Sequence, residues 1–220
     1  MWLNPFAILA FFLLSIFAVV LLQVGILTLA FDKLGLSPGS AFLLLFVSLM
    51  GSAINLPLFK VRASEPQEPI VPPPVLRMLK IRLPPFDGYT VIALNVGGGL
   101  IPIAFSLYLL LHNPGLWGKA LVATSLVAAI SYASSRPVPG IGIGMPILVA
   151  PLTAAIIALT IGAEQSAPLA YISGTLGVLI GADILRLNNI RQMGSPIASI
   201  GGAGTFDGIF ITGIVAVLLA

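Results

Sequence analysis

The sequence predicts an all-α, polytopic membrane protein of about seven transmembrane helices, and three observations lead to this fold class. Of the 220 residues, 58% are hydrophobic and only 8% are charged, with a mean hydropathy of +1.12, whereas a soluble domain carries ~25% charged residues. Apolar runs close to the ~20 residues needed to cross a hydrocarbon core recur along the chain. The charges of the connecting loops also alternate between two sides. We expect one transmembrane domain over residues 1–220.

Seven apolar segments account for the expected helices. Gly and Pro mark the loops between them, as in Leu36-Ser37-Pro38-Gly39 and Asn113-Pro114-Gly115. The apolar run before Ala30 is too long for a signal-peptide core and has no basic residues before it, so we expect it to remain as a span. In chain order, the expected spans are residues 5–30, 40–57, 89–111, 118–134, 142–162, 168–184 and 204–220.

Basic residues give the expected orientation. The loops after the second, fourth and sixth spans hold eight of the ten basic residues, namely Lys60, Arg62, Arg77, Lys80, Arg82, Arg136, Arg186 and Arg191. The opposite side holds only Lys33 and Lys119. Because cytoplasmic loops are enriched in Lys and Arg, the N-terminus is expected in the cytoplasm and the C-terminus outside. The Pro-rich, basic loop 58–88 is then cytoplasmic, either as a solvated linker or lying on the anionic inner leaflet.

Composition excludes several classes of function. The chain has no cysteine and one histidine, so thiol nucleophiles, cysteine metal sites and histidine clusters are excluded. Its net charge of +3 is spread over the loops, which does not indicate nucleic-acid binding. We expect no cofactor, since nothing in the spacing selects a metal at Asp183, Asp207 and Asn188. The lipid bilayer is the expected partner, and the oligomeric state is left open.

Two aspartates lie inside apolar, glycine-rich segments. Asp183 lies at the end of the sixth expected span, and Asp207 lies about one turn into the seventh. A carboxylate near the centre of a bilayer costs ~2.5–3.5 kcal/mol even on the mild insertion scale, so intramembrane acids indicate function. The expected orientation places both near the cytoplasmic surface.

Other polar groups and glycines fall in the same leaflet. Asn55, Asn95 and Arg136 are expected at this depth, which indicates one site open toward the cytoplasm. The glycines allow broken helices beside a water-filled cavity, or close helix packing, and both interpretations remain open. The expected supporting residues are Asn55, Asn95, Gly97, Gly98, Arg136, Gly181, Gly204, Thr205 and Gly208.

Three functions are compatible with these residues. In an aspartyl hydrolase, Asp183 and Asp207 would share a proton, one activating water and the other polarising a peptide carbonyl. In an ion-coupled transporter or channel, the same carboxylates would bind protons or cations. In a structural role, they would pair with Arg136, Arg186 or Arg191, or cap a helix near Gly204.

Two resemblances bear on this choice. Gly181-Ala182-Asp183 and Gly204-Thr205-Phe206-Asp207-Gly208 loosely resemble the Gly-x-Gly-Asp signature of the presenilin, signal-peptide-peptidase and prepilin-peptidase group, although neither matches it fully. That resemblance implies an intramembrane aspartyl protease with Asp183 and Asp207 as the catalytic pair and a membrane protein or peptide as substrate.

A second resemblance rests on five segments spread over most of the chain. They are Asn95-Val96-Gly97-Gly98, Arg136-Pro137-Val138-Pro139-Gly140, Ser173-Gly174-Thr175-Leu176-Gly177, Gly181-Ala182-Asp183 and the run from Gly201 to Gly208. With these segments the chain resembles a prokaryotic polytopic membrane family of unknown function. This resemblance implies a multi-pass protein of the prokaryotic cytoplasmic membrane and carries no activity with it.

Overall fold

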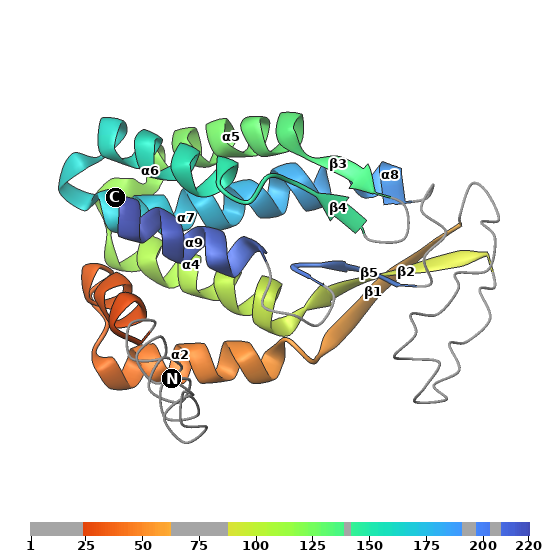
Figure 1. Cartoon of the computed structure of the whole chain (residues 1–220), viewed down its shortest axis with the longest axis horizontal. Coiled ribbons are helices and arrows are strands. Elements are labelled where there is room, and N and C mark those ends of the chain that lie inside the picture. The colour runs from red at the N-terminus through yellow and green to blue at the C-terminus, as the bar shows by residue number, and fades with distance from the viewer. Residues whose placement is uncertain (1–23, 63–87, 139–141, 191–196, 203–207) are drawn as a thin grey trace, which may run out of the picture.

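A helical bundle continues at one end into strands (Figure 1). The computed structural model describes residues 24–62, 88–138, 142–190, 197–202 and 208–220. Two helical segments, Pro114–Ser134 and Ala163–Asn189, are long and apolar enough to cross a membrane. A third candidate joins helix Val24–Lys33 to α2 (Pro38–Gly51), with a bend of 111° between them. The expectation of a mostly helical protein with apolar candidate spans is confirmed, while the number of spans stays a prediction.

Helix α7 (Ser166–Val178) occupies the centre of the bundle. Its small residues allow close packing, because a Cβ atom at Gly177 would lie 2.5 Å from Val127 Cγ1. A Cβ atom at Gly174 would lie 3.3 Å from Ala154 Cβ on the other side. Gly174 and Gly177 therefore serve close helix packing, one of the two interpretations of the glycines that the sequence left open. The helices around α7 are α4 (Ile101–His112), α5 (Trp117–Ser134), α6 (Val149–Ile161) and α9 (Gly208–Leu219), with short turns η2 (Pro114–Leu116) and η3 (Ala163–Gln165) between them.

A three-stranded sheet replaces the expected helix at the ends of two spans, so the chain is not all-α. Strand β2 (Tyr89–Asn95) lies between β1 (Asn55–Arg62), which is antiparallel to it, and β5 (Ile197–Ile200), which is parallel to it. The expected spans 40–57 and 89–111 are correspondingly shorter in the structure. Strands β1 and β2 each contain β-branched and aromatic residues, which suit a pleated sheet.

A second small sheet follows α5. Strand β3 (Arg136–Val138) pairs with β4 (Gly142–Gly144) in antiparallel register. Helix α6 therefore begins at Val149, seven residues later than expected. Pro146 and three glycines precede this helix, and such residues disfavour an earlier helical start. A short helix, α8 (Leu187–Ile190), lies at the same end of the bundle (Figure 1).

Charged residues gather at the two ends of the bundle. Lys60, Arg62 and Arg136 belong to strands at the sheet end, and Arg186 lies in the turn that leads into α8. Lys33 and Lys119 lie at the other end, and Lys33 Nζ donates to the carbonyl oxygens of Val217 and Leu218, both at 3.4 Å. This arrangement agrees with the loop alternation seen in the sequence. Arg77, Lys80, Arg82 and Arg191 lie outside the described residues.

Candidate functional site

Asp183 lies in a π-helical turn at the end of α7. This turn, η4 (Leu179–Ile184), continues the helix, and the N–H of Leu185 donates to the carbonyl of Ile180 at 2.9 Å, an i to i+5 hydrogen bond. The side chain of Asp183 is half-buried, and its turn is followed by α8, at the sheet end of the bundle (Figure 1). Single π-helical turns are frequent at functional sites.

The carboxylate of Asp183 binds the start of the glycine-rich segment. Its Oδ2 accepts a hydrogen bond of 2.9 Å from the backbone N–H of Gly201. Gly201 and Gly202 have φ angles of +82° and +96°, in the left-handed region that favours glycine. A Cβ atom at Gly201 would also lie 2.6 Å from the backbone nitrogen of Gly99. Glycine is therefore required here both for backbone conformation and for close approach.

Asn95 organises a second π-helical turn, η1 (Val96–Leu100). Its side chain is 1% exposed, and Oδ1 accepts a hydrogen bond of 2.8 Å from the N–H of Gly98. Nδ2 donates to the carbonyl of Ser52 at 2.7 Å and to Oδ1 of Asn55 at 3.1 Å. Because a buried amide must be hydrogen-bonded, Asn95 fixes η1 against the end of α2.

Gly97 allows α2 to touch this turn. Any side chain at Gly97 would overlap the carbonyl oxygen of Ser48 on α2. In addition, the Ser48 hydroxyl donates to the carbonyl of Gly97 at 2.6 Å. The two expected glycines, Gly97 and Gly98, thus serve backbone contact and backbone hydrogen bonding respectively.

Asn55 joins the outer strands of the sheet. Its Oδ1 accepts from Asn95 Nδ2 and also from the hydroxyl of Ser199 at 2.6 Å. Ser199 lies on β5, two residues before Gly201. A chain of contacts therefore runs from α2 through both asparagines and β5 to Asp183. The sequence predicted that Asn55, Asn95 and Asp183 lie at one depth, and the structure brings them into this common network.

Gly181 and Arg136 have other surroundings. A Cβ atom at Gly181 would overlap the carbonyl oxygen of Ala128, so Gly181 packs η4 against α5. Arg136 is exposed on β3, and none of the hydrogen bonds described above for the site involves it.

Arg186, three residues after Asp183, holds the end of α5 instead. Its Nη2 donates to the carbonyls of Tyr132 at 2.6 Å and Ser135 at 2.9 Å, and its guanidinium lies 4.1 Å from the centre of the Tyr132 ring. A cation on the last carbonyls of a helix also interacts favourably with the helix dipole. The sequence offered Arg186 only as a partner for an aspartate, and nothing in its spacing indicated α5.

Asp207, Gly204 and Thr205 lie outside the described residues. The distance between the carboxyl groups of Asp183 and Asp207 therefore stays a prediction. Gly208 is the first residue of α9. Ile209 is 1% exposed and belongs to the same buried cluster as Leu179, Ala182 and Ile200. The residues on both sides of the glycine-rich segment therefore pack near the turn that carries Asp183.

Among the described residues, no group of three or more His, Cys, Asp or Glu side chains is placed to hold a metal ion. The acidic residues in this part of the chain are Asp32, Glu164 and Asp183. Asp32 lies in the last turn of the helix Val24–Lys33, and Glu164 lies in η3, both at the end of the bundle opposite the sheet. Asp183 is therefore the described acidic residue at the site. The chemistry available there is that of a half-buried carboxylate beside glycine backbone.

Comparison with known proteins gives a family. A family model described as "Protein of unknown function (DUF1614)" matches residues 49–219. This range includes both π-helical turns, the three-stranded sheet and Asp183. No curated protein and no solved structure matches the chain. Since the match covers most of the sequence, the protein belongs to the DUF1614 family.

Proposed function

We propose that this protein is a multi-pass protein of the cytoplasmic membrane and hydrolyses peptide bonds with an aspartyl pair, Asp183 and Asp207. The membrane part of the proposal is supported by helix length, since the 18 residues of α5 span ~27 Å at ~1.5 Å per residue, against a hydrocarbon core of ~30 Å. Large apolar side chains on its surface support it too, such as Leu121, which is 72% exposed.

The observation that carries the catalytic proposal is the hydrogen bond between Asp183 and Gly201. It attaches one carboxylate to the segment that leads, six residues later, to the other. Ile200 and Ile209, before and after that segment, share one buried cluster with Ala182. A short segment whose two ends return to the turn of Asp183 favours a close approach of the carboxylates.

Two adjacent carboxylates have a defined chemistry. Like charges at ~3 Å cannot both ionise, so such a pair holds one proton between its members. The ionised carboxylate takes a proton from water as the water attacks the peptide carbonyl, and the protonated carboxyl donates a hydrogen bond to the carbonyl oxygen. The half-buried position of Asp183 at the end of the bundle suits this reaction, because water must reach it.

The substrate proposed is a membrane protein or peptide segment that enters from the sheet end. The half-buried side chain of Asp183 supports this entry side, because a substrate must reach the carboxylate.

The test uses the full chain in proteoliposomes with a library of fluorescence-quenched apolar peptides. Asp183→Asn and Asp207→Asn should each reduce cleavage by at least about 100-fold, the scale of losing a general acid or base. Asp32→Asn, at the opposite end of the bundle, is the matched control and should cleave as the natural chain does. Cleavage that persists in both site variants would refute the aspartyl pair.

A structural role for Asp183 is the second candidate, and the same hydrogen bond favours it. The carboxylate connects η4 to the residue that follows β5. Asparagine keeps an acceptor oxygen for the N–H of Gly201, whereas alanine does not. A structural role therefore predicts that Asp183→Asn stays folded and retains any activity, and that only Asp183→Ala is destabilised. The catalytic role predicts a folded and inactive Asp183→Asn protein.

A further inference from the structure

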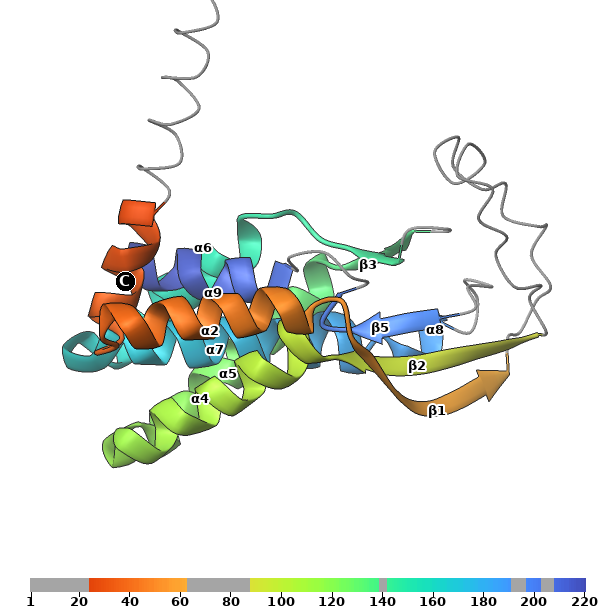
Figure 2. The ribbon, with the colours of Figure 1, turned by 90° about the horizontal axis from the view of Figure 1, so that it is seen from below.

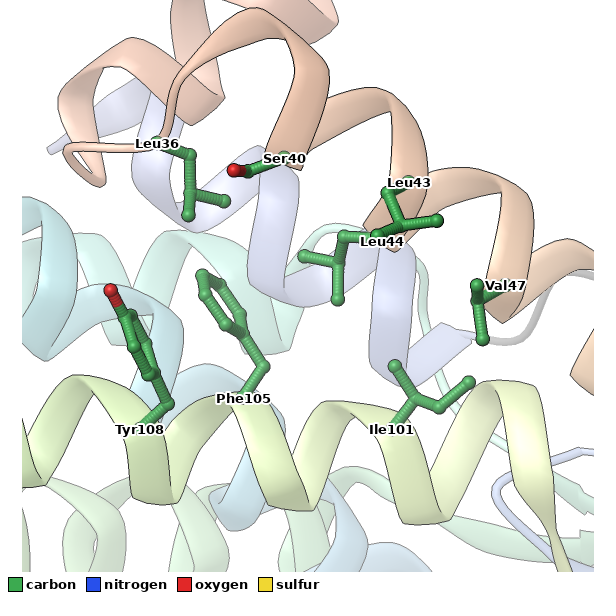
Figure 3. Close-up of a pocket in the computed structure, with 8 residues that line it drawn as sticks. All are labelled: Leu36, Ser40, Leu43, Leu44, Val47, Ile101, Phe105 and Tyr108. Atoms are coloured by element: carbon green, nitrogen blue, oxygen red, sulfur yellow. The ribbon is translucent and has the colours of Figure 1, made fainter.

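We infer that a groove between α2 and α4 binds one acyl chain of a membrane phospholipid. The groove has a volume of about 390 Å³. Figure 3 shows Leu44 and Val47 of α2 facing Ile101 and Phe105 of α4 across it. This inference depends on the proposed membrane location and is independent of the aspartyl chemistry.

The groove results from how α2 is attached. At its C-terminal end, α2 contacts η1 through Ser48 and Gly51, and a Cβ atom at Gly51 would lie 3.0 Å from Val96 Cγ1. From this contact α2 and α4 spread apart toward the other end of the bundle (Figure 2). Two apolar helices that diverge within a bilayer leave a space that only an apolar group can fill, since water is absent there.

The lining of the groove suits an acyl chain. Ser40 and Val47 on α2, like Ile101 and Tyr108 on α4, are seven residues apart, or ~10 Å along the helix. An acyl chain lying along this length would contact apolar walls, because six of the eight lining residues are apolar, namely Leu36, Leu43, Leu44, Val47, Ile101 and Phe105.

The polar groups of the groove lie at one end. The hydroxyls of Ser40 and Tyr108 are both at the end farther from η1 (Figure 3). Ser40 Oγ lies 3.0 Å from Ser37 Oγ, and the Tyr108 and His112 rings are 4.0 Å apart. Hydroxyls at this end can donate to the ester carbonyls of a phospholipid, with the acyl chain extending along Leu44 toward Val47.

The open side of the groove is continuous with the apolar surface that the bilayer would cover. Leu43, on the rim, is 60% exposed, and the neighbouring Phe42 is 69% exposed. A phospholipid can therefore enter sideways from the bilayer. In the proposed orientation the hydroxyl end faces the outer leaflet, because it lies at the end opposite the sheet.

The experiment counts bound lipid by native mass spectrometry. The full chain is purified in detergent, stripped of loosely bound lipid, and mixed with palmitoyl-oleoyl phosphatidylglycerol at limiting concentration. We expect one phospholipid per chain on the natural protein and at least a ten-fold lower occupancy on Leu44→Trp, whose indole fills the groove. Leu121→Trp, the same change on the exposed face of α5, should bind as the natural protein does.

Val47→Phe serves as a second groove-filling variant if Leu44→Trp does not elute as a single folded species. Equal lipid occupancy in the natural, groove-filled and Leu121→Trp proteins would overturn the inference. So would a natural chain that binds no lipid and instead forms a dimer lost on groove filling, because a second copy would then be the occupant. Asp183→Asn should bind the lipid as the natural protein does. Lipid occupancy therefore tests the groove, and peptide cleavage tests the aspartyl pair, so each proposal can fail without the other.

Discussion

At the scale of single residues, the contact between Gly97 and Ser48 decides whether α2 can reach the site. Gly97→Ala places a methyl group on the carbonyl oxygen of Ser48. Relief of this overlap requires a backbone shift, so we expect a loss of about 1–3 kcal/mol in the free energy of unfolding. Equilibrium unfolding in mixed micelles measures the change.

Gly118→Ala is the matched control. Gly118 lies in α5, and nothing lies within 4 Å of a Cβ atom built there. Alanine is favoured over glycine in a helix by about 0.5–1 kcal/mol, so this variant should be as stable as the natural chain or more so. Equal losses in the two variants would contradict the close contact at Gly97.

The expected direction of each span across the membrane was enough to predict that Asn55, Asn95 and Asp183 lie at a similar depth in the membrane. It was not enough to predict their partners, because hydrogen bonds depend on the register of β1 against β2 and on the path after β5. Arg136 was expected in the site on depth alone, yet its strand leaves it exposed. Arg186 was missed as a support because α5 contacts it from about 50 residues away in sequence.

At the scale of elements, Arg186 joins the end of α5 to the end of η4. We expect Arg186→Ala to destabilise the protein by about 1.5–3 kcal/mol, the range for hydrogen bonds to a charged group. Arg186→Lys should also lose stability, because an ammonium cannot reproduce the planar fork that meets two carbonyls and a ring.

Arg136→Ala is the comparison for this prediction, measured in the same unfolding experiment. Its side chain is exposed, so the change should stay within about 0.5 kcal/mol. A larger loss of unfolding free energy from Arg136→Ala than from Arg186→Ala would contradict this prediction. It would show that the β3–β4 sheet depends on arginine more than the end of α5 does.

The helices of the bundle were predictable, and the strands were not. Long apolar segments such as 118–134 have the length of a span, and α5 matches that range to within one residue. Tyr89–Asn95 is a short apolar run directly before another, and periodicity alone cannot separate a buried strand from a helix in such a run. The register that makes it a strand comes from β1 and β5, which lie far from each other in sequence.

At the scale of the whole molecule, the two ends of the bundle should lie on opposite sides of the membrane. The chain contains no cysteine, so single cysteines report without background. Lys60→Cys and Arg136→Cys should react with a membrane-impermeant maleimide only from the cytoplasmic side. Lys119→Cys and Glu164→Cys should react only from outside.

Labelling of right-side-out and inverted vesicles measures this difference. Reaction of all four cysteines from one side would contradict a bundle that crosses the bilayer, and a reversed pattern would invert the proposed orientation. Either result would change the side of the membrane expected for Asp183, because η4 leads into α8 and α8 lies at the same end of the bundle as β3, the strand of Arg136 (Figure 1).

The central claim is that two carboxyl groups meet beside the glycine-rich segment. The most direct measurement is their separation in an experimental structure of the full chain in lipid nanodiscs. The account predicts that the carboxyl groups of Asp183 and Asp207 lie within ~6 Å, close enough for each to change the ionisation of the other. A separation beyond ~10 Å, where charges are largely screened from each other, would contradict it.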